Sequence, residues 1–213
     1  GVPSGYSVGD GALYFSHEEG KSKVVVDIPF SSDTAVSSGD FVAFNGKMQA
    51  YVGHSFNSNF SFMLGQFDTP YGVEVNDSKD NLFVTQGLAY GVIPVTHMGL
   101  ALKYEMNGLS LMVISGNANQ KTAPTLTDDK EMALRLGWSN DKYRFSVGQV
   151  TNQIKDDAVG SYDAATTMDI TAGANFGKFT LDIQSDTKTT GVISTNTTAE
   201  DITAMMVLLG YTA

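Results

Sequence analysis

Apolar residues alternate with polar or small residues through most of this 213-residue chain, and this alternation constrains the fold more than any other feature. Leu100, Leu102 and Tyr104, for example, alternate with Ala101 and Lys103. Successive side chains of a β-strand point to opposite faces, whereas an amphipathic helix needs apolar residues three and four positions apart. The alternation therefore predicts an all-β chain whose strands have one apolar face and one polar face.

The same pattern predicts eleven strands. They begin near residues 12, 23, 42, 59, 94, 109, 130, 142, 165, 178 and 201. Single-chain β-barrels of bacterial outer membranes have even strand numbers. A short strand within residues 2–8, or a strand trimmed from the N-terminus, would make the count even. We therefore expect about 12 strands.

The connections between the expected strands alternate between short and long. The short turns are His17–Lys21, Ser55–Asn59, Asn107–Gly108, Ser139–Lys142 and Gly177. The long external loops are expected near 31–40, 68–91, 117–129, 151–164 and 188–200. Tight turns at one end and longer loops at the other are typical of outer-membrane barrels. The order predicts one domain, residues 1–213, folded as a transmembrane antiparallel up-and-down β-barrel.

Aromatic residues gather near the short turns. They are Phe15, Phe56, Phe60, Tyr104, Trp138, Tyr143, Phe176 and Phe179. Trp and Tyr favour the membrane–water interface, because an apolar ring with a polar tip suits that depth. The positions predict a ring of aromatic residues near one rim of a barrel. The alternative is that these side chains fill the core of a soluble β-sandwich.

Composition argues against several other classes of protein. The 23 acidic and 13 basic side chains give a formal net charge of -10, whereas nucleic-acid binding needs clustered Lys and Arg. The absence of Cys excludes a disulfide scaffold, a thiolate zinc site and a cysteine nucleophile. His17, His54 and His97 lie on different expected hairpins, and no Gly-x-Ser-x-Gly sequence accompanies them. We therefore expect no enzyme activity, no cofactor, no metal and no nucleic-acid partner.

Two ordered motifs lie within residues 48–119. The first is Gly65–Glu74 (GQFDTPYGVE), and the second is Ile93–Gly99 (IPVTHMG). Their order and separation resemble those of the OmpL-like β-barrel porin family of Gram-negative outer membranes, although Gln66 stands where that family usually has Lys or Arg. The resemblance implies a transmembrane β-barrel in the bacterial outer membrane, with a pore function.

In a barrel, the polar face of each strand lines the interior. The side chains expected to line a pore are Lys47, Gln49, Lys103, Glu105, Arg135, Arg144, Asp169 and Asp182. Either these groups form a polar channel that selects solutes, or they pair with one another and plug the lumen. The alternation does not decide between these two interpretations.

The longest expected loop, 68–91, carries the first motif. The candidate residues of this region are Asp68, Thr69, Pro70, Tyr71, Gly72, Glu74 and His97. Loops of such length are often functional, so this one could fold inward and narrow a pore. In the alternative, Pro70 and Gly72 only set a turn where the strand leaves the membrane. Glu74 and His97 either form hydrogen bonds that fix the loop or lie at the surface.

These features together predict a porin-like channel for passive diffusion of ions or small polar solutes. The expected partners are outer-membrane lipid and those solutes, and a homo-oligomer is an option because outer-membrane porins often form trimers. Acidic residues of the expected loops, Asp77 and Asp80 among them, predict a mild cation preference. Two alternatives stay open: a plugged barrel with a structural or surface-recognition role, and a soluble β-barrel that binds a small apolar ligand.

Overall fold

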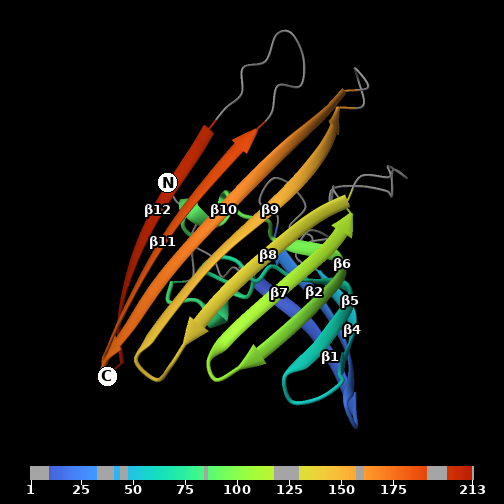
Figure 1. Cartoon of the computed structure of the whole chain (residues 1–213), viewed down its shortest axis with the longest axis horizontal. Helices are drawn as coiled ribbons and strands as arrows, with labels where there is room; N and C mark the ends of the chain where they lie inside the picture. The colour runs from blue at the N-terminus through green and yellow to red at the C-terminus, as the bar shows by residue number, and fades with distance from the viewer. Residues whose placement is uncertain are drawn as a thin grey trace.

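One antiparallel sheet contains every strand of the described chain (Figure 1). The computed structural model describes residues 10–32, 41–43, 48–83, 86–117, 130–156, 161–190 and 201–212. The strands are β1 (Asp10–Glu19), β2 (Ser22–Ser32), β3 (Phe41–Ala43), β4 (Gln49–Ser55), β5 (Phe60–Asp68), β6 (Thr96–Met106), β7 (Leu109–Asn117), β8 (Lys130–Ser139), β9 (Tyr143–Asp156), β10 (Ser161–Phe176), β11 (Phe179–Thr190) and β12 (Asp201–Tyr211). Two short 3₁₀ helices, η1 (Ser78–Asp80) and η2 (Leu88–Gly91), lie between β5 and β6. No helix in these ranges is long and apolar enough to cross a membrane.

The strands pair in the order β1-β2-β4-β5-β6-β7-β8-β9-β10-β11-β12, and β3 also pairs with β2. This up-and-down topology confirms the fold class predicted from the sequence. β3 and β4 pair with successive parts of one edge of β2, so the strand expected to begin near residue 42 is split in two. Among the described residues the wall therefore has eleven strand positions, because β3 and β4 together occupy one of them. The segment 2–8, proposed above as a further strand, lies outside the described residues.

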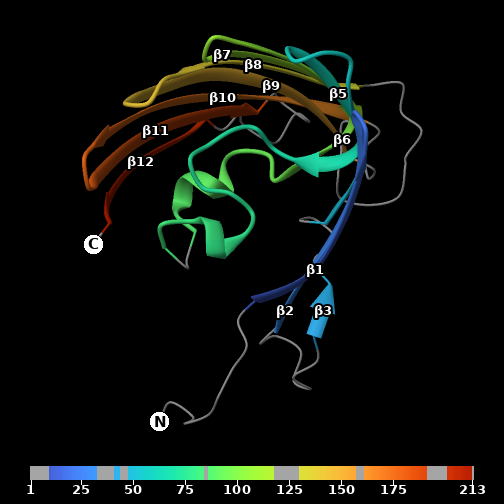
Figure 2. The ribbon, with the colours of Figure 1, turned by 90° about the horizontal axis from the view of Figure 1, so that it is seen from below.

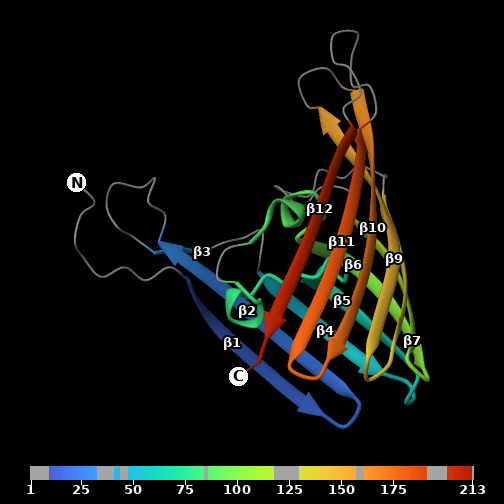
Figure 3. The same cartoon turned by 90° about the vertical axis from the view of Figure 1, so that its left-hand side faces the viewer.

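The sheet is strongly curved and encloses a concave face on one side (Figures 2 and 3). Long antiparallel sheets twist and coil in this way, and barrel walls are made from such sheets. β1 and β12 form its two edges, and within the described residues no backbone pairing joins them. The described part of the chain is therefore a curved wall that is open between β1 and β12.

The outward face of this wall is largely apolar, whereas its concave face carries buried charged groups beside a smaller apolar cluster that includes Phe67, Met112 and Ile114. Leu134 and Ile170, which point outward, are 51% and 52% exposed, whereas the carboxylates of Asp169 and Asp186 on the concave face are buried. An apolar band of this kind is stable in contact with lipid hydrocarbon and would be unfavourable in water. The soluble-barrel alternative requires apolar side chains to point inward, and the structure contradicts it.

The short turns lie together at one end of the sheet, as Figure 1 shows. The tightest of them is the two-residue turn Asn107–Gly108, whose φ angles of 51° and 83° are those of a type I′ hairpin. Asn and Gly adopt such positive φ angles more readily than other residues, because bulkier side chains clash with the backbone there. The sequence therefore predicts this turn from its residue types alone.

Exposed aromatic rings lie near the same end of the sheet as the short turns. Trp138 stacks on Phe145 with ring centroids 6.1 Å apart. The ring centroids of Phe179 on β11 and Tyr211 on β12 lie 5.1 Å apart. Phe15, Phe56, Tyr143 and Phe176 are likewise exposed on the described strands and turns. This arrangement is the predicted ring of aromatic side chains at a membrane interface.

The strands β9 and β10 are longer than the sequence predicts. Residues 151–156 pair with residues 161–166, so most of the segment 151–164 is strand and not loop. The prediction was wrong because this segment lacks the alternation of the apolar band, with Thr151, Asn152 and Gln153 in succession. A strand that extends beyond the hydrocarbon needs no apolar face, since water solvates both of its sides.

The last strand, β12, carries apolar side chains on both of its faces. Met205, Val207 and Leu209 are exposed on the outward face. On the concave face, η2 packs against β12, and the Met206 sulfur lies close to Gly87. The second apolar face of β12 is thus covered by the segment between β5 and β6.

The position of the apolar band predicts the outcome of placing a charge within it. Leu134→Arg should cost about 2–4 kcal/mol of folding free energy, and Leu109→Arg, beside the Asn107–Gly108 turn, about 0–1 kcal/mol. The difference arises because a charge near the interface still reaches water. Urea unfolding of protein folded into lipid vesicles measures both changes. Equal losses at the two positions would contradict this placement of the band.

Candidate functional site

The segment 69–95, which joins β5 to β6, lies against the concave face of the sheet (Figure 2). We call this segment the inward loop; its residues 84 and 85 lie outside the described ranges. The Thr69 N–H donates to the Val95 carbonyl across 3.1 Å and closes its neck. Of the two arrangements that the sequence leaves open for the loop at 68–91, the structure has the inward one.

Tyr71 makes the deepest contact of the inward loop with the wall. Its side chain is 3% exposed, and its hydroxyl lies 3.0 Å from the Leu134 carbonyl oxygen and 3.1 Å from that of Gln149. Its ring rests on Gly148 of β9, where any Cβ atom would overlap the ring. Burial, followed by the charge of two neighbouring carboxylates, raises the pKa of Tyr71 above its usual range. The hydroxyl therefore remains a proton donor to the wall.

The two residues after Tyr71 bond to polar side chains of β10 and β11. The Gly72 N–H donates to Asp169 Oδ2 across 3.2 Å, and the Val73 N–H donates to Gln184 Oε1 across 2.8 Å. Gly72 has a φ of 80°, and a Cβ atom there would lie 2.6 Å from the Ile93 side chain. Both the backbone conformation and the available space therefore require glycine at this position.

Hydrogen bonds within the inward loop fix its shape. The Gly87 N–H lies 2.8 Å and 3.1 Å from the two carboxylate oxygens of the buried Glu74. Asn76 donates to the Asp68 carboxylate and to the Val95 carbonyl, and accepts a hydrogen bond from the Tyr90 hydroxyl. Of the two roles open for Glu74 in the sequence, the structure shows the hydrogen-bonded one.

His97 connects the neck of the inward loop to the wall. This fully buried side chain of β6 contacts the Glu131 carboxylate on β8 through Nδ1. Its Nε2 lies 3.0 Å from the Thr69 hydroxyl. The chain Glu131–His97–Thr69 therefore joins β8 to the first residue of the loop.

Seven of the eight side chains predicted to line a pore lie on the concave face. They are Gln49, Lys103, Glu105, Arg135, Arg144, Asp169 and Asp182. Lys47 lies outside the described residues. Lys103 Nζ lies 2.9 Å from Glu105, and Arg144 Nε donates to Asp182 across 2.7 Å. Each of these side chains lies on the face to which the alternation of its strand assigns it. Their role along a solute path remains a prediction.

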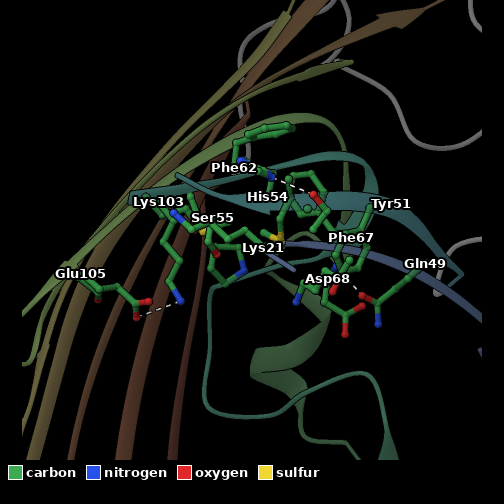
Figure 4. A pocket seen from close by; sticks show the side chains of 18 of the residues that line it. Lys21, Gln49, Tyr51, His54, Ser55, Phe62, Phe67, Asp68, Lys103 and Glu105 are labelled. Carbon is green, nitrogen blue, oxygen red and sulfur yellow. Dashed lines mark hydrogen bonds and ion pairs between the residues drawn. The ribbon is translucent and has the colours of Figure 1, made fainter. Parts of the chain in front are cut away.

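Two cavities flank the root of the inward loop. The larger, of about 440 Å³, is lined by Lys21, Tyr51, His54 and Lys103 among others (Figure 4). The smaller, of about 320 Å³, is lined by Gly72, Arg144 and Asp182 among others. Ser110 and Arg135 line both cavities. The concave face thus keeps open volume beside the loop, bordered by charged and hydroxyl groups.

Several polar side chains of the concave face were not among the predicted residues. They are Asp27, Glu131, Thr167 and Asp186. Each occupies the next inward-facing position of a strand whose other inward positions the sequence already indicates. Glu131 precedes Ala133 and Arg135, and Asp186 follows Asp182 and Gln184. Extending each alternation by one more step would have found them.

Charge at the inward loop is partly balanced. Hydrogen bonds from Lys79 to Asp77 and Asp80 raise the pKa of Lys79 to about 12. Asp77 and Asp80, two of the acidic residues expected in the loops, thus have Lys79 of the inward loop as a cationic partner. In the described part of the chain, no group of three or more His, Asp or Glu side chains has a metal-site arrangement.

Comparison with known proteins decides the family. Residues 4–212 match the sequence profile of the family described as putative beta-barrel porin-2, OmpL-like. The chain belongs to this family. Membership extends the resemblance seen in the two motifs to almost the whole sequence, and it places the chain in the outer membrane of bacteria as a β-barrel porin. No curated protein sequence matches it.

Solved structures of OmpT, an outer membrane protein of Vibrio cholerae, share the fold. The loop L8 deletion mutant has a TM-score of 0.60 and 15% identity, over 95% of this chain and 68% of that one. The outer-membrane expressed form has a TM-score of 0.59 and 14% identity, over 95% of this chain and 62% of that one. The in-vitro folded trimer form has a TM-score of 0.61 and 15% identity, over 96% of this chain and 64% of that one. This member of the OmpL-like family therefore spans about two thirds of the length of OmpT.

The contact between Tyr71 and Gly148 predicts how the inward loop can be released. Gly148→Val should displace the ring and its hydrogen bond, which contributes about 0.5–1.5 kcal/mol, and raise cleavage after the exposed Lys79 by trypsin roughly tenfold. Mass spectrometry of timed digests of folded protein measures this rate. Gly91→Ala is the matched control, because a Cβ atom there meets nothing within 4 Å. Unchanged cleavage in Gly148→Val would contradict an anchoring role for Tyr71.

Proposed function

We propose that this OmpL-like porin is a channel for passive diffusion of ions and small polar solutes across the outer membrane, narrowed by the inward loop. The observation that carries the proposal is the attachment of this loop to the concave wall beside two cavities that charged side chains border. The loop is held by Tyr71 on β8 and β9 and by Gly72 and Val73 on β10 and β11. A segment so fixed restricts the cross-section without closing it.

The cavities favour an open interior over a plugged one. A volume of about 440 Å³ holds roughly 15 water molecules, since each occupies about 30 Å³ in the liquid. The pairs Lys103–Glu105 and Arg144–Asp182 lie along the walls of these cavities and do not span them. Charges paired along a wall leave a hydrated path, whereas charges paired across a lumen would fill it.

A homo-oligomer is part of the proposal, because OmpT occurs in a trimer form. The outward apolar face supports it, since such a surface can pack against a second copy as well as against lipid. Chemical cross-linking in the membrane should then give a ladder that ends at one discrete size.

Single-channel recording in a planar bilayer tests the channel itself. We expect discrete steps whose size rises with salt concentration, and a reversal potential that shows mild cation preference in a KCl gradient. The preference follows from the net charge of -10. Anion preference would contradict the charge argument, and silence from protein shown to be inserted would support the plugged barrel with a recognition role.

Loosening the inward loop should alter the current. Tyr71→Ala removes the ring from Gly148 and both possible hydrogen bonds to β8 and β9, so we expect a larger step or added flicker. Tyr143→Ala is the control, because Tyr143 lies on the outward rim and touches neither the loop nor the cavities. Identical recordings from both variants would contradict a constriction formed by this loop.

A further inference from the structure

Three buried oxygens without a hydrogen-bond partner lie close together on the concave face of β10 and β11. They are Asp169 Oδ1, Asp186 Oδ1 and Thr167 Oγ1, on side chains that are 1%, 0% and 2% exposed. Asp169 stands directly opposite Asp186 in the antiparallel register. Thr167 precedes Asp169 by two residues and therefore shares its face, diagonal to Asp186.

The second oxygen of each carboxylate is already engaged. Asp169 Oδ2 accepts the Gly72 N–H across 3.2 Å, and Asp186 Oδ2 accepts from Gln184 Nε2 across 2.7 Å. These bonds hold both carboxylates in place and leave their Oδ1 atoms without a donor, and the two carboxyl groups lie within hydrogen-bonding reach of each other. Together with the Thr167 hydroxyl, which lies one row further along β10 and opposite Lys188, they supply three oxygen ligands on one face of the wall.

The negative charge of this pair is only partly balanced by nearby basic groups. Two buried carboxylates side by side are strongly unfavourable unless a proton or a cation neutralises them. Among the described residues, neither Asp169 nor Asp186 forms an ion pair with a basic side chain. Arg135 lies in the same row of the sheet and attracts the Asp169 carboxylate, but Gly148 and the ring of Tyr71 stand between the two side chains. Lys188 stands opposite Thr167 in the register and forms no ion pair with either carboxylate.

We propose that Thr167, Asp169 and Asp186 bind a hard divalent cation, with Ca²⁺ as the best match. Ca²⁺ takes carboxylate, neutral oxygen and water ligands in flexible geometry, and its charge balances two carboxylates. Zn²⁺ favours nitrogen or sulfur ligands, which this set lacks, and Mg²⁺ demands a stricter octahedron. A proton shared by the two Oδ1 atoms would leave the Thr167 oxygen without a partner.

The site lies where the inward loop is attached. The carboxylate of Asp169 binds the cation through one oxygen and the Gly72 N–H through the other, so the bound ion would fix the acceptor on which the loop rests. Only two of the ligands are carboxylates, so we expect weak binding, with a Kd of roughly 10⁻⁴–10⁻³ M. The proposal does not depend on conduction and is tested without it.

Terbium luminescence of the folded protein in detergent tests the site directly. Tb³⁺ replaces Ca²⁺ at oxygen sites, and Tyr71 lies beside Asp169 to sensitise its emission. We expect saturable emission that Ca²⁺ displaces in the wild type and in the control Asp182→Asn, whose partner is Arg144. Asp186→Asn, which keeps the shape of the side chain, and Thr167→Val should lose this emission tenfold or more.

Thermal unfolding gives a second measurement that does not use the probe. At about 10 mM Ca²⁺ the folding equilibrium of the wild type should shift roughly 10- to 100-fold relative to protein in chelator, and that of Asp186→Asn should not. Equal terbium signals in wild type and Asp186→Asn would overturn the proposal. Stabilisation by acidification alone, with no effect of Ca²⁺, would overturn it in favour of a shared proton.

Discussion

The requirement that every backbone N–H and C=O within lipid be paired shapes this molecule. A continuous antiparallel ladder meets the requirement from β1 to β12, and it forces successive side chains onto opposite faces. The outward face can then be largely apolar, while most charged side chains of the wall point to the concave face. In the described part of the chain, the outer edges of β1 and β12 lack a strand partner.

The inward loop follows from the same constraint. Polar groups gathered on the concave face need partners, and the loop supplies backbone N–H groups to Asp169 and Gln184. At Gly148 the wall leaves space for the Tyr71 ring, because any side chain at this position would overlap the ring. The same contacts therefore hold the loop and organise the wall, and Asp169 links the proposed constriction to the proposed cation site.

The sequence predicts local features well and long-range ones poorly. Alternation around Leu134 or Ile170 specifies both the strand and its lipid face, and the pair Asn107–Gly108 specifies its own turn. The position of the inward loop depends on partners far away in sequence, such as Tyr71 with Gln149 or Gly72 with Asp169, and a local pattern carries no signal of them. The extensions of β9 and β10 were missed because they leave the apolar band that makes strands visible.

The most direct test of the central claim uses the absence of Cys from this chain. Ser110 lines both cavities beside the inward loop, whereas its neighbour Leu111 faces lipid. Single-channel current would be recorded from Ser110→Cys and Leu111→Cys before and after adding a charged methanethiosulfonate reagent. A solute path along the concave face predicts a stepwise block in Ser110→Cys and none in Leu111→Cys. An unchanged current in Ser110→Cys, with mass spectrometry showing full modification, would contradict that path.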